Sequence, residues 1–141
     1  MKKFKFELED VLSLRKFQQE QAQIELGKAV AEEVKIQDNL NLLALQHVEA
    51  KKNLAGSTDF SAIINGQQYF SFLKKQEEKL LEDLAAAKIF TDTKREAFKE
   101  ALQKTESINK LKEKQLAEYK ELEAKEEEDT IDDMVTARFG K

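Results

Sequence analysis

Apolar side chains recur at alternating spacings of three and four residues along most of the chain, which is the heptad spacing of a coiled coil. In the first part of the chain, ten of the fourteen positions in this series between Leu8 and Leu54 are apolar. In the second part, ten of the seventeen positions between Phe70 and Glu126 are apolar. The pattern predicts two long helices, each with one apolar stripe that another helix must cover, because helices this long and this charged are not stable alone.

Loop-forming residues cluster only between the two stripes, at residues 55–66. Gly56 is placed to end the first helix, and Asn65-Gly66 is a turn dipeptide ahead of the second. We therefore predict one coiled-coil domain over 1–141, with a helix over about 5–55, a loop over 56–66 and a helix over about 67–138. The fold class is all-α, a long antiparallel two-helix coiled coil (α-hairpin) with a longer, overhanging second helix.

A hairpin whose tip lies near residue 60 sets the register. Residue i then faces roughly residue 121 − i, so Leu8 lies near Glu113 and residues after about Glu118 have no partner within the chain. We expect a monomer. A homodimeric rod, in which the two helices pair between chains, is the structural alternative.

The composition agrees with this fold, since the 141 residues include no Pro and only four Gly. Turns use most of the Pro and Gly in a globular domain, so a many-stranded β protein or a compact α/β enzyme is disfavoured. The chain also has no Cys, which excludes disulfides, thiolate metal sites and thiol nucleophiles. It has no long apolar segment and no apolar stretch behind its basic N-terminus, so we expect a soluble, cytoplasmic protein.

The charge is uneven. Between Glu118 and Asp133, nine acidic residues stand against Lys120 and Lys125, a local net charge of −7 in a chain whose total is −4. The remaining +3 is too dilute to predict nucleic-acid binding. After the acidic run, Ile131, Met134 and Val135 recur at helical spacing. The C-terminal part therefore reads as an amphipathic helix that awaits a protein partner with a basic lining, because anionic lipid would repel it.

The chain offers no constellation for catalysis. His47 is the single histidine and falls on the first stripe, so neither a catalytic triad nor a histidine-rich metal site can form. The acidic run lacks the calcium-loop pattern, and the isolated glycines form no phosphate-binding loop. We predict that the chain is not an enzyme and has no catalytic, cofactor-binding or metal-binding residues, and hence no cofactor.

Aromatic residues gather near the predicted turn, more densely than one seam can bury. Tyr69, Phe72 and Leu73 can form an exposed apolar patch with Leu42, Leu43 and Leu45 of the first helix. Alternatively, Phe60, Ile63 and Ile64 fold back as a cap and cover these rings.

Both ends of the chain resemble the flagellar export protein FliJ family. The N-terminal run Phe6-x-Leu8-x-x-Val11-Leu12-x-Leu14-Arg15, followed by Glu20 and Ala22, is similar to the opening of that family. Ile108, Leu111 and Lys112 resemble a stretch late in its second helix, and Ile131-Asp132-Asp133 with Arg138 resembles its C-terminal signature. The predicted hairpin and its longer second helix agree with the family over essentially the whole chain.

The resemblance implies a non-enzymatic cytoplasmic component of the flagellar type III export apparatus, which acts at the cytoplasmic face of the inner membrane in flagellum biogenesis and motility. Members of the family form a stalk-like coiled coil, insert the end with both termini into the ring of the export ATPase, and promote its assembly and activity. They also contact the cytoplasmic domain of the export-gate membrane protein FlhA and bind export chaperones. All membrane association implied is through protein contacts.

The resemblance also assigns two surfaces. The ATPase-ring end comprises Phe4, Phe6, Leu8, Val11, Leu12, Arg15, Asp132, Asp133, Met134, Val135 and Arg138. The export-gate face comprises Asn39, Leu43, Gln46, Tyr69, Leu73, Gln76 and Leu80; here the chain departs from the family in having no aromatic residues at Gln46 and Ala50.

Two other functional classes fit a long hairpin. A general coiled-coil holdase chaperone or a scaffold and adaptor protein would bind its clients through apolar surface at the tip. A factor that enters the secondary channel of RNA polymerase would need paired acids at the tip to hold a metal ion, and the loop offers only Asp59.

Overall fold

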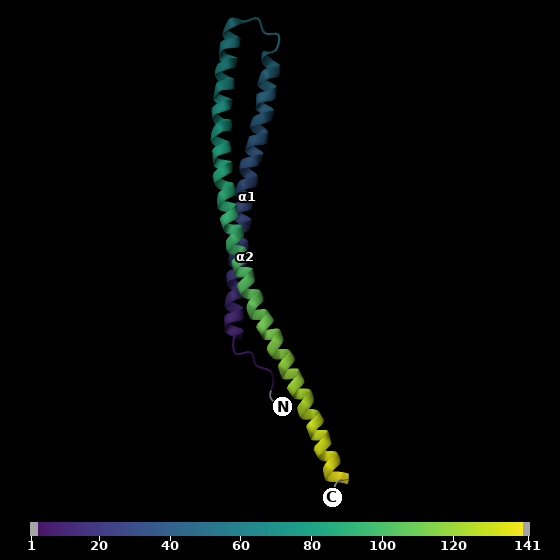
Figure 1. The fold of residues 1–141 in the computed structure, drawn as a ribbon. Helices are drawn as coiled ribbons and strands as arrows, with labels where there is room; N and C mark the ends of the chain where they lie inside the picture. Colours follow the sequence, from purple (N-terminus) through teal and green to yellow (C-terminus); the bar gives the residue numbers. More distant parts are fainter. Residues whose placement is uncertain (1–2, 140–141) are drawn as a thin grey trace. The chain divides into compact units, whose positions relative to one another are not determined.

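The computed structural model describes residues 3–139 and contains two helices, α1 (Glu9–Leu54) and α2 (Phe60–Phe139) (Figure 1). The helices pack against each other as an α-hairpin, and α2 is the longer one. The predicted fold class is therefore confirmed.

The chain divides into two compact units, and each long helix contributes to both. The loop unit is 21–98, and the terminal unit consists of the N-terminal part up to Glu20 together with the part from Lys99 onward. Each unit is an antiparallel pair of helical segments, and in the terminal unit an extended stretch over 3–8 precedes α1.

The heptad stripes are the buried seam of the hairpin. Of the fourteen stripe positions from Leu8 to Leu54, every one except His47 is buried or half-buried. In α2, every stripe position from Phe70 to Tyr119 except Glu77 is buried or half-buried, whereas Leu122 and Glu126 are exposed. The three-and-four spacing therefore identified the contact surface almost residue by residue.

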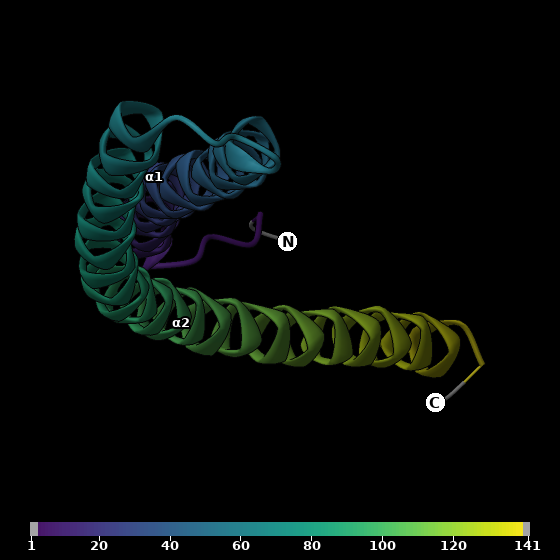
Figure 2. The ribbon, with the colours of Figure 1, turned by 90° about the horizontal axis from the view of Figure 1, so that it is seen from above.

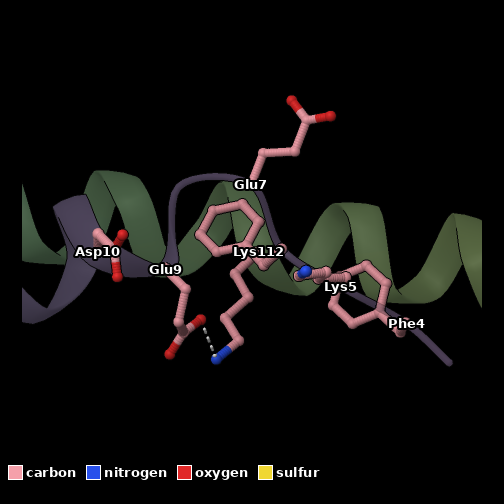
Figure 3. Close-up of a pocket in the computed structure, with 7 residues that line it drawn as sticks. Phe4, Lys5, Glu7, Glu9, Asp10 and Lys112 are labelled. Carbon is pink, nitrogen blue, oxygen red and sulfur yellow. Dashed lines mark ion pairs between the residues drawn. The ribbon is translucent and has the colours of Figure 1, made fainter.

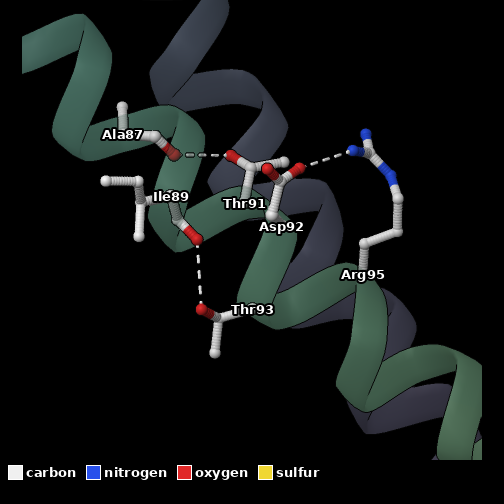
Figure 4. Close-up of polar contacts among 6 residues, drawn as sticks. All are labelled: Ala87, Ile89, Thr91, Asp92, Thr93 and Arg95. Carbon is white, nitrogen blue, oxygen red and sulfur yellow. Dashed lines mark hydrogen bonds and ion pairs between the residues drawn. The ribbon is translucent and has the colours of Figure 1, made fainter.

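Small side chains occupy several of the most buried seam positions. Ala29 on α1 and Thr91 and Thr105 on α2 are buried, and Thr91 is only 1% exposed. Each threonine hydroxyl donates to the carbonyl oxygen four residues earlier: Thr91 to Ala87 at 2.9 Å (Figure 4), and Thr105 to Ala101 at 3.0 Å. The hydroxyls are thus satisfied inside their own helix, so the seam can bury them without a partner on α1.

Contacts across the seam confirm the predicted register in both units. In the terminal unit, the Glu9 carboxylate lies 2.9 Å from the Lys112 ammonium, and their numbers sum to 121. In the loop unit, the His47 and Phe70 rings meet edge to face at 5.0 Å, with a sum of 117. The Glu9–Lys112 pair is largely solvent-exposed and contributes about 1 kcal/mol or less, so the apolar stripe sets the register.

The loop is shorter than the predicted span of 56–66, because α2 begins at Phe60. Asp59 caps the helix: its side chain accepts from the Ser61 amide at 3.1 Å, and its carbonyl accepts from Ile63 at 3.0 Å. Asn65-Gly66 therefore lies inside α2 and not in a turn. Gly66 has a different role, since a Cβ there would overlap the Leu54 side chain, and its absence lets the end of α1 approach α2 closely.

The first helix also begins later than the predicted residue 5, at Glu9. Residues i and i+2 of a helix point about 200° apart, whereas residues i and i+2 of an extended segment point to the same side. Phe4 and Phe6 can therefore both turn toward α2 only if the segment is extended. Phe6 is buried and the Phe4 ring lies 5.5 Å from the Tyr119 ring, so aromatic packing overrides helix formation here.

Two glycines of α1 and the loop give a matched test of backbone conformation. Gly56 follows α1 with φ +81°, as a helix-ending glycine should, while Gly27 lies inside α1; both have open space where a Cβ would be. We expect Gly56→Ala to lower the free energy of unfolding by about 1 kcal/mol, because a side chain disfavours positive φ. Gly27→Ala should raise it by about 1 kcal/mol through helix propensity.

Urea unfolding followed by circular dichroism measures both changes. Equal effects of the two substitutions would contradict the left-handed conformation of Gly56, since neither site has a neighbour to clash with.

Candidate protein-binding surfaces

The last turns of α2 form the largest helical surface in the terminal unit without a partner. Tyr119 is half-buried against Phe4, and beyond it every described residue is exposed except Glu123, which is half-buried. Figures 1 and 2 show this part of α2, drawn in yellow-green to yellow, with no other segment of the terminal unit beside it. We call residues 120–139 the C-terminal segment; its exposure confirms the predicted overhang within this unit.

The C-terminal segment has two chemically different faces. After Leu122, the next three positions that continue the seam carry acids, Glu126, Asp129 and Asp133. The apolar residues Ile131 and Val135 lie well over a quarter turn around the helix from the seam, because successive residues advance by about 100°. Both are at least half exposed, with exposed fractions of 59% and 50%. A partner that covers the apolar face therefore approaches from a different side than α1 does.

The extended stretch over 3–8, which we call the N-terminal segment, forms an open hollow of about 700 Å³ against α2 in the terminal unit (Figure 3). Phe6 is 6% exposed at its base, and the Glu9–Lys112 ion pair closes one side. Lys5, Glu7 and Asp10 add charges of both signs to the wall. Such a mixed, wide hollow has no set of convergent polar groups that would position a small ligand.

The residues assigned to the ATPase-ring end fall into three groups by burial. Phe6 and Leu12 are buried, so these two side chains stabilise the terminal unit and are not available to a partner. Phe4, Leu8, Val11 and Arg15 are half-buried, and Arg15 donates to the Gln18 side chain at 3.0 Å. The C-terminal members are all exposed: Asp132, Asp133, Met134, Val135 and Arg138.

The loop unit presents one uncharged face along one side of its seam. Tyr69 and Gln76 on α2, with Asn39 and Gln46 on α1, occupy equivalent heptad positions that flank the seam on the same side. All four are exposed. Leu42 and Phe72 are also exposed, with exposed fractions of 56% and 54%, and they extend this amide face outward.

The remaining residues assigned to the export-gate face belong to the seam below the amide face. Leu73 is 3% exposed, and Leu43 and Leu80 are half-buried. They hold the helices together and position the exposed members above them. Of the two alternatives for the aromatic cluster, the exposed patch is supported, because Phe60 itself is 75% exposed; Leu45 lies farther from the seam than Leu42 does.

The opposite side of the loop unit carries a groove that the stripe pattern did not predict. It has a volume of about 320 Å³ and is lined by Leu40, Leu43, Ala44, His47, Val48, Leu73 and Glu77. His47 and Glu77 are both seam residues and both exposed. Polar residues at one stripe position of each helix are the sequence signal for this opening, since neither side chain fills an apolar seam.

Within residues 3–139, no three His, Asp or Glu side chains are grouped so that they could hold a metal ion. Over the same range, neither helix contains a segment apolar enough to cross a bilayer.

Comparison with known families decides between the classes that a long hairpin allows. The family model of the flagellar FliJ protein matches residues 4–141. The chain belongs to the flagellar FliJ protein family. It is therefore a component of the flagellar export apparatus, with a role in flagellar biogenesis and protein export. No curated protein and no solved structure gives a significant match to the chain.

The N-terminal segment of this FliJ-family chain gives a test of the terminal unit. We expect Phe6→Ala to lower the free energy of unfolding by about 3 kcal/mol, because it removes a buried ring. Phe17→Ala is the matched control; that ring is 57% exposed and its removal should change stability by less than about 0.5 kcal/mol.

Hydrogen exchange locates the effect. The Leu12 amide, which donates to the Leu8 carbonyl at 2.8 Å, should exchange faster in Phe6→Ala, while the Ile63 amide in the loop unit should not. Unchanged exchange at Leu12 would contradict the anchoring role of Phe6.

Proposed function

We propose that the chain is the stalk-like coiled coil of the flagellar export ATPase. In this proposal, the terminal unit inserts into the ATPase ring and promotes its assembly and activity, and the loop unit contacts the cytoplasmic domain of FlhA and the export chaperones. One copy acts in each ring, in the cytoplasm at the face of the inner membrane, and it contributes no catalytic residue of its own.

The exposed C-terminal segment carries this proposal. It is already helical without a partner, so its binding does not require the segment to be ordered first. Its apolar side chains are large, exposed and spaced for one contact face, and its acids favour a receptor lined with Lys and Arg.

The mechanism is a shift of conformational populations in the ring. The N-terminal segment and the first turns of α1 cover one side of α2 in the terminal unit and leave its other sides exposed. Subunits arranged around this unit would therefore meet different surfaces. A ligand that binds one conformation of a subunit more tightly than another shifts the equilibrium between them, and an asymmetric stalk does so differently for each subunit.

The amide face of the loop unit supports the contact with the export gate. Charged residues are depleted from the centres of protein interfaces and aromatic residues are enriched there, and this face combines three amides with Tyr69 and Phe72. The buried Leu73 beneath it keeps the two helices in place.

The first test is the turnover rate of a purified flagellar export ATPase with the full chain and with a chain that ends at Lys120. This end point keeps Tyr119 and therefore the contact with Phe4. We expect the truncation to abolish stimulation. Ile131→Gln with Val135→Gln in the full chain should reduce it about tenfold or more, because two contact residues lose their apolar side chains.

Ile89→Gln is the matched control, since Ile89 is as exposed as these residues but lies in the loop unit. Full stimulation by the truncated chain would contradict the insertion of the C-terminal segment. No stimulation by the full chain, together with binding to diverse unfolded proteins, would instead favour the holdase.

The second test addresses the loop unit by the affinity for the FlhA cytoplasmic domain. We expect Tyr69→Ala with Phe72→Ala to weaken binding about tenfold or more, because aromatic anchors supply much of the energy of an interface. Leu81→Gln, at an exposed position of α2 on the other side of the seam, should leave the affinity unchanged. Equal losses in both variants would show that the amide face is not the contact.

A further inference from the structure

The outer face of α1 in the loop unit carries a second apolar stripe that neither helix of the hairpin covers. It follows the same alternation of three and four residues as the seam, and six of its eight positions lack a polar side chain. The exposed fractions of its four largest members lie between 49% and 67%. We call it the outer stripe: Ile24, Gly27, Ala31, Val34, Asp38, Asn41, Leu45 and Val48.

The outer stripe is continuous with the opening in the seam. Val48 belongs to the outer stripe and also lines the groove beside Leu43 and Leu73. A helix that lies along the outer stripe could therefore also place side chains in the groove, where apolar surface of both α1 and α2 is accessible. Single exposed apolar residues are ordinary on a protein surface, but a heptad stripe next to a groove is the surface that packs a further helix.

Within and beside the outer stripe, four lysines stand against two acids, Asp38 in the stripe and Glu49 on its edge. Lys28 and Lys35 lie along one edge, and Lys51 and Lys52 lie near its end. All four lysines are exposed, and the Lys28 ammonium forms an ion pair with the Glu25 carboxylate at 3.4 Å. The surface therefore fits an amphipathic helix that is acidic.

The chain itself contains such a helix. The C-terminal segment lies in a region with a local net charge of −7, and it exposes Ile131, Met134 and Val135 on one side. Each of the two surfaces also carries one charge opposite to its surroundings, Asp38 in the outer stripe and Arg138 beside the apolar residues of the segment. Asp38 and Arg138 can form an ion pair when the two surfaces are in contact.

We propose that the C-terminal segment of a second copy of the chain docks on the outer stripe. This head-to-tail contact is favoured over a symmetric one, because two outer stripes face to face would bring their lysine edges together. The self-association uses the same segment that the proposed function places in the ATPase ring. Resting on that proposed function, it follows that free chains shield this segment until the ring displaces it.

The test is the sedimentation of the full chain over a range of concentrations, without the ATPase. We expect reversible self-association whose dissociation constant rises about tenfold or more between low and high salt, because salt screens the charge attraction. Leu45→Gln with Val48→Gln should abolish it, as should Ile131→Gln with Val135→Gln. Ile89→Gln, equally exposed but on α2, should leave it intact.

A fluorescent peptide of residues 118–139 provides a direct probe. It should bind the full chain and lose about tenfold or more in affinity to the Leu45→Gln, Val48→Gln variant. A monomer at every concentration would overturn the proposal and leave the outer stripe to another protein. Self-association that survives Ile131→Gln with Val135→Gln would overturn the head-to-tail contact in favour of a symmetric one. Because the ATPase is absent, neither result depends on the proposed function.

Discussion

The structure depends on a single narrow seam between two helices. A two-helix protein has no second layer, so few side chains are buried, and apart from Phe6 the most buried ones lie on the seam. Within each unit, the seam must therefore keep its apolar positions in contact. Leu12, Leu73 and Leu84 provide large buried surfaces along it, while Ala29 and Thr91 allow close approach between them.

This constraint explains why so much of the fold could be predicted from the sequence. The three-and-four spacing of apolar residues gave the buried face of both helices, and Gly56 gave the end of α1. The errors came where local sequence rules competed with packing. Asn65-Gly66 resembles a turn, yet Asp59 caps α2 six residues earlier, and Gly66 is needed where Leu54 packs. At the N-terminus, the packing of Phe4 and Phe6 favours an extended segment where a helix was predicted.

The candidate surfaces were less predictable, because exposure of a side chain depends on its phase around the helix. Resemblance to the FliJ family selected exposed residues such as Tyr69 and Met134 together with buried ones such as Phe6 and Leu73. Sequence similarity does not separate a residue that contacts a partner from one that positions it. Val34 and Val48 belong to the outer stripe, which is as regular as the seam. It was not recognised from the sequence, because the seam of the same helix already accounts for a three-and-four spacing.

The acids that replace apolar residues at the seam positions of the C-terminal segment have a consequence for how such a chain can change during evolution. Glu126, Asp129 and Asp133 end the paired part of the coiled coil, because a partner helix there would have to bury carboxylates. The sequence of α2 therefore determines where the unpaired part of the helix begins. The free end can therefore change in length without altering the paired seam, whereas the segment ahead of Glu9 is held to its length by the buried Phe6 and by the contact of Phe4 with Tyr119.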